Sequence, residues 1–208
     1  MADRRGLIVD YGGVLTTDVF ASFRVFCAAE GLEPDAMRER LRSDTEAREL
    51  LAQLETGALA AAEFEPRLAA LLEVESERLI ARLFGGLEPD VAMLDGVRAA
   101  HRDGVRTALL SNSWGDALAY DDALLEELFD AWVISSQVGL RKPEPAIYEL
   151  AAERLGLPPA ACVFVDDLPG NLKPARAMGI ASVVHRDAAS TIAELEELLG
   201  VRVSPAAA

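Results

Sequence analysis

Short apolar runs that end at polar or turn residues recur along the chain, and helical spacing follows most of them. Runs of this length are typical of strands that are buried on both faces of a sheet. Strands that alternate with helices predict an α/β fold in which a parallel sheet lies between layers of helices. The predicted strands are residues 7–9, 105–110, 131–134, 162–165 and 180–184, and the later helices end near residue 102, open near 113–116 and cover 143–155, 169–178 and 191–199.

A purely helical stretch separates the first predicted strand from the second. From about residue 18 to residue 80, apolar side chains recur every three or four positions without a strand signal. Pro66 is expected in the first turn of a helix, which indicates roughly four short helices in this stretch. Gly85 and Gly86 mark the return of the chain to the core. The expected domains are an inserted helical bundle at residues 17–85 and a core of residues 1–16 and 86–208, which ends in a frayed tail from residue 201.

Charge and cysteine content exclude several classes of protein. The 208 residues carry a formal net charge of −15, whereas nucleic acids and anionic membranes require clustered basic residues. Cys27 and Cys162 lie in apolar surroundings and form no disulfide framework, which is typical of a reducing compartment. No apolar run reaches the roughly 18 residues of a membrane span, and no signal-type segment precedes the first strand. We expect a cytoplasmic protein without a nucleic-acid or membrane partner, of undetermined oligomeric state.

Acidic residues stand directly after two of the predicted strands. Asp10 ends the first strand and is followed closely by Gly12 and Gly13, and Asp166 and Asp167 end the fourth. The carboxyl ends of parallel strands form one edge of a sheet, where binding and catalytic groups gather. Adjacent acids repel each other, and Mg²⁺ prefers carboxylate oxygens together with waters and a phosphate oxygen. We expect a magnesium site at this edge; the alternative is that the acid pair only caps the helix after it.

A hydroxyl cluster and a lysine follow two other strands. Ser111, Asn112 and Ser113 end the second strand and precede an expected helix, whose free N–H groups could bind an anion. Lys142 follows the third strand, and it and Lys173 are the only lysines in the chain. A lysine ammonium neutralises a carboxylate or a phosphate as a point charge. An acid, a hydroxyl, a lysine and an acid pair, each after a strand, predict one shared site more strongly than any of them does alone.

The two histidines give no comparable signal. His101 is expected on the polar face of a helix and His185 just past the last strand, both at the surface. No Ser-His-Asp arrangement and no zinc-ligand spacing can be assembled from them.

The four groups resemble the motifs of the haloacid dehalogenase-like hydrolase superfamily, in which Asp10, Ser111, Lys142 and the pair Asp166-Asp167 stand at the matching positions. This resemblance implies a Rossmann-like core with an inserted C1-type helical cap. The likeness covers the whole chain, and three longer segments look like the N-terminal phosphatase domain of soluble epoxide hydrolases. These segments are residues 109–114, 137–145 and 165–176.

The resemblance also implies a function and a role for each residue. The enzyme would hydrolyse a small organic phosphate monoester with Mg²⁺, through an aspartyl-phosphate formed on Asp10. The catalytic residues would be Asp10, Ser111 and Lys142. The substrate's phosphate would be bound by Ser111, Asn112, Ser113 and Lys142, and Mg²⁺ by Asp10, the Gly12 carbonyl, Asp166 and Asp167.

Position 12 departs from the family's pattern. Phosphatases of this superfamily usually carry a second aspartate two residues after the nucleophile, which protonates the leaving group and then activates water, and here that residue is Gly12. We expect metal binding to survive and esters with poor leaving groups to react slowly, unless Asp18 supplies the proton. Two alternatives stay open: a phosphate-ester-binding module with weak catalysis, and a haloacid dehalogenase. The dehalogenase pattern places a tyrosine two residues after the nucleophile, whereas Tyr11 is only one residue after it.

Overall fold

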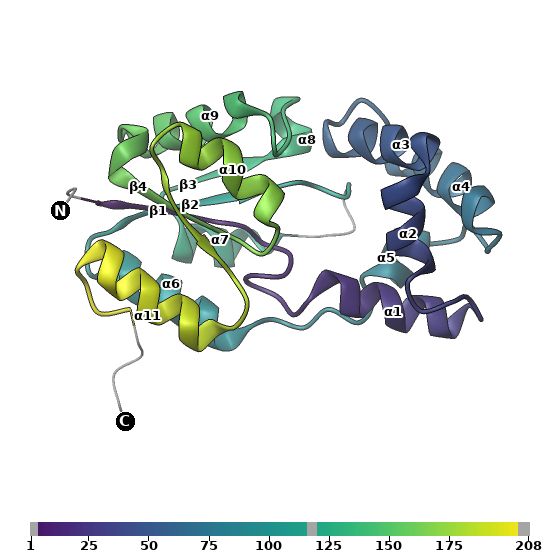
Figure 1. Cartoon of the computed structure of the whole chain (residues 1–208), viewed down its shortest axis with the longest axis horizontal. Coiled ribbons are helices and arrows are strands. Elements are labelled where there is room, and N and C mark those ends of the chain that lie inside the picture. Colours follow the sequence, from purple (N-terminus) through teal and green to yellow (C-terminus); the bar gives the residue numbers. More distant parts are fainter. Residues whose placement is uncertain (1–3, 116–119, 204–208) are drawn as a thin grey trace.

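The structure, a computed structural model, describes residues 4–115 and 120–203. Five parallel strands form one sheet in the order β3-β2-β1-β4-β5, with the helices arranged around it (Figure 1). This arrangement confirms the predicted α/β fold. The strands are β1 (Gly6–Val9), β2 (Arg106–Ser111), β3 (Ala131–Ile134), β4 (Cys162–Asp166) and β5 (Ala181–Val184).

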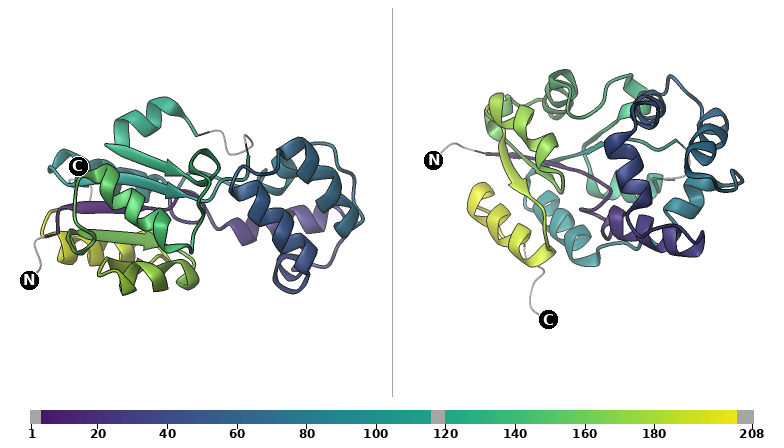
Figure 2. Two further views of the ribbon diagram at one scale, coloured as in Figure 1. Left: turned by 90° about the horizontal axis from the view of Figure 1, so that it is seen from above. Right: turned by 45° about the vertical axis from the view of Figure 1, so that its right-hand side comes forward.

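Helices cover both faces of the sheet, because successive residues of a strand point to opposite faces. In β1, Leu7 and Val9 pack in one buried cluster with α6, α7 and α11, whereas Ile8 packs in a second cluster with α9 and α10. Figure 2 shows the two helical layers from further directions. These elements are α6 (Val91–Arg102), α7 (Asp122–Leu128), α8 (Ser135–Val138), α9 (Pro145–Leu155), the 3-10 helix η1 (Pro159–Ala161), α10 (Pro169–Ala177) and α11 (Ala188–Leu199).

Five helices between β1 and α6 lie within the range predicted for the cap and have a buried cluster of their own. The chain enters and leaves this part side by side, because Thr16 pairs with Pro89 and the Thr17 N–H donates to the Glu88 carbonyl over 2.8 Å. The helices between these two crossings lie beyond the carboxyl edge of the sheet (Figure 1). The helices are α1 (Val19–Ala29), α2 (Ala36–Ser43), α3 (Thr45–Glu55), α4 (Ala61–Leu72) and α5 (Leu79–Leu83).

No helix opens at residues 113–115, so the prediction of a helix near residues 113–116 is wrong for the described part of that stretch. Asp116 lies outside the described residues. The next helix, α7, begins only at Asp122. The Ser113 N–H donates instead to the Ser135 hydroxyl over 2.8 Å, and Trp114 packs in the cluster of the cap. Long-range contacts therefore hold this segment out of a helix.

Pro66 does not stand in the first turn of a helix, as expected, but inside α4. Proline removes one backbone hydrogen bond in such a position. Phe64 and Leu68, on either side of it, are both fully buried in the cap cluster, so packing offsets the lost bond.

Two expectations of surface exposure are also wrong. Val203, in the tail expected to be frayed, is fully buried, and its N–H donates to the Glu196 carboxylate over 2.9 Å. Residues 204–208 of that tail lie outside the described residues. His185 is buried, and its Nδ1 lies 3.0 Å from the Thr191 hydroxyl. His185 therefore links the end of β5 to α11, and Val203 packs in the buried cluster that contains α6 and α11. Among the described residues, the helices are too short or too polar to cross a membrane.

Candidate active site

The carboxyl edge of the sheet brings the predicted residues together. In the register of the sheet, Val9 of β1 lies beside Val165 of β4 and Leu109 of β2. The residues that follow are therefore neighbours, and the Asp10 N–H donates to the Val165 carbonyl over 3.0 Å. Side chains separated by more than a hundred positions in the sequence meet here because all five strands run in the same direction.

Lys142 lies at the centre of this group and is almost fully buried. Its Nζ lies 2.7 Å from an oxygen of Asp10 and 2.7 Å from an oxygen of Asp166. Asn112 holds the backbone of Lys142 from both sides, because its amide donates to the Lys142 carbonyl over 3.1 Å and accepts from the Lys142 N–H over 2.8 Å. The lysine ammonium is thus fixed between the first and the fourth motif.

Asp166 is fully buried, and its carboxylate is already well supplied with partners. Besides Lys142, it accepts from the Leu168 N–H over 2.8 Å and from the Asn171 amide over 3.0 Å. Asp167 is half-buried and lines the cavity, which Asp166 does not. The two adjacent acids therefore differ: Asp166 orients the lysine, and Asp167 presents its carboxylate to the cavity.

Burial dominates the electrostatics of these groups. It raises the pKa of Asp10 well above the ordinary value; Lys142 opposes this shift, and Asp166 and Asp167 add to it. Burial and the charge of Asp166 raise the pKa of Asp167 to about 6. Burial alone would lower the pKa of Lys142, but Asp10 and Asp166 outweigh it and raise that pKa. The site therefore holds more negative charge than Lys142 balances, and a bound cation would stabilise its ionised form.

The hydroxyl cluster contributes unequally to the site. Ser111 and Asn112 line the cavity. Ser113 does not line it; it is buried, and its hydroxyl donates to the Gly115 carbonyl over 3.3 Å. Tyr120, which the sequence reasoning missed, donates its hydroxyl to the Ser111 oxygen over 2.8 Å. Because that oxygen accepts from Tyr120, the Ser111 hydrogen is available to an acceptor in the cavity.

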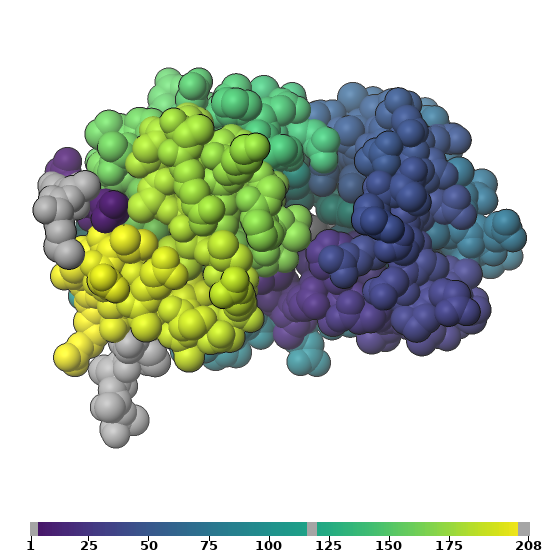
Figure 3. All heavy atoms as spheres, in the orientation of Figure 1, coloured from purple at the N-terminus to yellow at the C-terminus, as the bar shows by residue number. Residues whose placement is uncertain are grey.

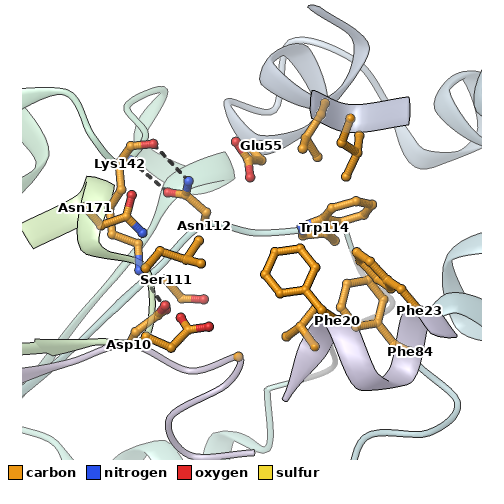
Figure 4. Close-up of a pocket in the computed structure, with 16 residues that line it drawn as sticks. Asp10, Phe20, Phe23, Glu55, Phe84, Ser111, Asn112, Trp114, Lys142 and Asn171 are labelled. Carbon is orange, nitrogen blue, oxygen red and sulfur yellow. Dashed lines mark hydrogen bonds and ion pairs between the residues drawn. The ribbon is translucent and has the colours of Figure 1, made fainter. Parts of the chain in front are cut away.

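These groups form one wall of a cavity of about 160 Å³ between the core and the cap. The opposite wall is mostly apolar, and Figure 4 shows its aromatic rings facing the polar residues. A hollow between the two parts is visible at the surface in Figure 3. The sequence reasoning missed this apolar wall, since its members come from separate helices and from the core. They are Val19, Phe20, Phe23, Leu41, Leu51, Phe84 and Trp114.

The three carboxylates at the sheet edge fit a hard divalent cation. Asp10, Asp166 and Asp167 each offer an oxygen, and these atoms lie within 4.8 Å of one another. Gly12 also lines the cavity, so its backbone is near the same place. Carboxylate and carbonyl oxygens of this kind are the donors that Mg²⁺ prefers.

A parallel sheet that gathers an acid, a hydroxyl, a lysine and an acid pair beneath a helical cap defines the class of capped α/β hydrolases. Within that class, the chain belongs to the haloacid dehalogenase-like hydrolases, because the model of this family matches residues 5–179. The family predicted from the motifs is therefore confirmed.

Two relatives and one solved structure show what the chain is similar to. The chain is 35% identical over 143 residues to bifunctional epoxide hydrolase 2 of Rattus norvegicus. The matched segment covers 66% of this chain but only 25% of that protein. The chain is 31% identical over 122 residues to a sesquiterpene phosphatase of Aspergillus oryzae, which is 56% of this chain and 60% of that one. A family enzyme of Bacteroides thetaiotaomicron, solved with magnesium and inorganic phosphate, shares the fold with a TM-score of 0.68 at 24% identity, covering 88% of this chain and 94% of that one.

Proposed function

We propose that this hydrolase is a Mg²⁺-dependent phosphatase that removes phosphate from a small organic phosphate monoester. The observation that carries the proposal is the contact of Lys142 with both Asp10 and Asp166, with Asp167 and Ser111 beside them in one cavity. A buried cation between carboxylates is suited to bind the anionic phosphoryl group next to a nucleophile. The similarity to a protein named as a phosphatase supports the same chemistry.

In this mechanism the reaction has two steps. The Asp10 carboxylate attacks phosphorus, and the bond from phosphorus to the ester oxygen breaks, which gives an aspartyl-phosphate and an alcohol once that oxygen takes a proton. A water molecule then attacks phosphorus and loses a proton, which releases inorganic phosphate and restores the carboxylate. Lys142 neutralises phosphate oxygens, Ser111 orients them with its hydroxyl, and Asn112, which lines the same cavity, fixes Lys142 in place.

Mg²⁺ would be held by Asp10, Asp167 and the Gly12 carbonyl, with Asp166 acting through Lys142 or a water molecule. When bound, the ion would neutralise phosphate charge during the transfer. Asp166 suits the outer position because its oxygens already accept from Lys142, Leu168 and Asn171.

The shape of the cavity indicates the kind of ester. The phosphate end faces the polar wall, so the carbon part of the substrate lies against side chains such as Phe20, Phe84 and Trp114. Transferring apolar surface out of water contributes about 25 cal/mol for each Å². An ester with a compact apolar carbon group therefore fits better than a sugar phosphate.

Release of inorganic phosphate from an aryl phosphate and an alkyl phosphate, with Mg²⁺ present, tests the proposal. We expect Asp10→Asn to lower release by roughly 10³-fold or more, because an amide keeps the shape but not the nucleophilic charge. Asp18→Asn is the matched control: Asp18 accepts from the Phe20 N–H over 2.8 Å as the cap of α1 and does not line the cavity.

Three results would contradict the proposed function as a Mg²⁺-dependent phosphatase. Release that is unchanged by a chelator would remove the metal from the mechanism. Phosphate binding without any turnover would identify a binding module. Halide release from a haloacid that persists in chelator would identify a dehalogenase.

A further inference from the structure

The residues named so far do not include the acid that protonates the leaving oxygen of the substrate. Glycine stands at position 12, where the resemblance implies that acid. Asp18, the first alternative, is unsuitable, because its oxygens bind the Phe20 N–H over 2.8 Å and face Arg24 over 3.4 Å, and the residue does not line the cavity.

The cavity has one carboxyl group without a role so far. Among the described residues that line it, the acids are Asp10, Glu55 and Asp167. Asp10 is the proposed nucleophile, and Asp167 is a proposed metal ligand. Glu55 ends α3 in the cap, and it is only 5% exposed.

Contacts with the core hold Glu55 in place. Arg141 donates to its Oε2 from Nε over 2.6 Å and lies 2.5 Å from the same oxygen with Nη2. The Glu55 carbonyl accepts from the Ser135 hydroxyl over 2.5 Å. Both contacts of Arg141 use one carboxylate oxygen, so Oε1 is not engaged by this ion pair. The side chain therefore has a fixed direction. Oε1 can still exchange a proton, because a carboxylate oxygen keeps a second lone pair even where the Asn112 amide hydrogen-bonds to it.

Glu55 lies on the side of the cavity toward which the leaving group would depart. Phosphoryl transfer is in line, so the leaving oxygen departs on the side of phosphorus away from the nucleophile. Asp10 belongs to the core wall, and the opposite side is the cap. Figure 4 shows Glu55 directed into the cavity from the cap, with Asp10 on the other side.

The charged groups that face Glu55 are Arg141 and Lys142, and the Asn112 amide also hydrogen-bonds to its carboxylate. Burial is the largest influence and raises the pKa of Glu55, while Arg141, Lys142 and Asn112 oppose the shift without cancelling it. A carboxyl group with a raised pKa holds its proton closer to neutral pH, as a general acid must.

We propose that Glu55 is the acid–base residue of this enzyme, an inference that rests on the proposed phosphatase function. Its protonated carboxyl donates a proton to the ester oxygen as the bond to phosphorus breaks, and the alcohol leaves. The resulting carboxylate takes a proton from the water that attacks the aspartyl-phosphate. Proton and charge are thereby restored after each turnover.

The experiment measures alcohol release in the first turnover of Glu55→Gln with two esters, a nitrophenyl phosphate and a simple alkyl phosphate. Nitrophenolate is a good leaving group and needs no proton to depart, whereas an alkoxide must be protonated as it leaves. General acid catalysis, which contributes roughly 10²–10⁴-fold, is therefore needed only for the alkyl ester. We expect the alkyl rate to fall by about 10²-fold or more and the nitrophenyl rate to change by less than about threefold. Arg141→Met is the matched control, because it breaks the same ion pair but keeps the carboxyl group; it should lower the alkyl rate by less than Glu55→Gln does.

Equal losses for the two esters in Glu55→Gln would overturn the proposal and leave Glu55 as an anchor of the cap. The wild-type enzyme gives a second measurement that needs no variant: an alkyl rate more than about 10⁴-fold below the nitrophenyl rate would show that no group protonates the leaving oxygen. If the wild type releases no alcohol or phosphate from either ester, the phosphatase function itself fails and this proposal with it.

Discussion

The two adjacent glycines of the first motif, Gly12 and Gly13, differ in whether the structure requires glycine at their position. Gly13 has φ of +76°, and a Cβ there would lie 2.7 Å from the Asp167 carboxylate. Only glycine meets both demands without strain. Gly12 does not have a positive φ, and a Cβ there would meet only the Val19 Cγ2, at 3.0 Å. The chain therefore requires glycine at position 13 but can accept a side chain at position 12.

At this scale we predict that Gly12→Asp folds and, on its own, changes alkyl phosphate turnover by less than about threefold, because Glu55 already supplies the proton. In the Glu55→Gln background, Gly12→Asp should restore alkyl turnover by about tenfold or more. Steady-state rates of the single and double variants measure this. A large gain in the wild-type background would instead mean that the native enzyme lacks an acid.

At the scale of elements, the end of α3 docks on α8. Gly57, with φ of +73°, lies so close that a Cβ would stand 2.5 Å from the Ser136 carbonyl. The Ser135 hydroxyl joins the Glu55 carbonyl to the Ser113 N–H. The short helix α8 thus links the cap to the segment that follows Ser111, and docking of the cap affects both walls of the cavity.

We predict that Gly57→Ala lowers kcat/KM by about tenfold or more, because the methyl group separates α3 from α8 and moves Glu55. Gly31→Ala is the control: Gly31 lies in the cap with φ of +70° but has no atom within 4 Å of a built Cβ. Backbone strain should cost each variant about 1–2 kcal/mol of folding free energy. The contact with Ser136 adds to this loss in Gly57→Ala, so kcat/KM is measured under conditions in which both variants are folded. Equal kcat/KM for the two variants would show that the docking of α3 does not matter for catalysis.

At the scale of the whole molecule, the acid cluster makes stability depend on pH and metal. A carboxyl whose pKa is raised on folding binds more protons in the native state, so its contribution to stability is lost as pH rises through the native pKa. For Asp167, with a pKa of about 6, this window runs from about pH 4 to pH 6. The raised pKa of Asp10 acts in the same direction.

We predict that the free energy of unfolding in chelator falls as pH rises from 4 to 7, with up to about 3 kcal/mol from Asp167, since each pKa unit corresponds to about 1.4 kcal/mol. Mg²⁺ should restore stability at pH 7, because it binds the ionised native cluster. Denaturant unfolding at several pH values measures both effects. Asp167→Asn should flatten the dependence; an unchanged slope in that variant would place the titration elsewhere.

The sequence by itself determined the order of the strands and of most helices along the chain, and the residues at the strand ends. Asp10, Ser111, Asn112, Lys142, Asp166 and Asp167 were all found this way, because each follows an apolar run and parallel strands end at one edge. Periodicity is a local property, so it is visible without the fold. The resemblance to a known family, which added the cap and the chemistry, rested on the same local motifs.

Only the tertiary structure decided which of these residues face the cavity and what lies opposite them. Ser113 turned away, and no helix opens at residues 113–115, because hydrogen bonds to Ser135 and packing of Trp114 in the cap outweigh the local preference for a helix. Glu55 meets Arg141, and Tyr120 meets Ser111, through contacts between separate elements. Such contacts leave no periodic signal in the chain, since they depend on how the cap docks on the core.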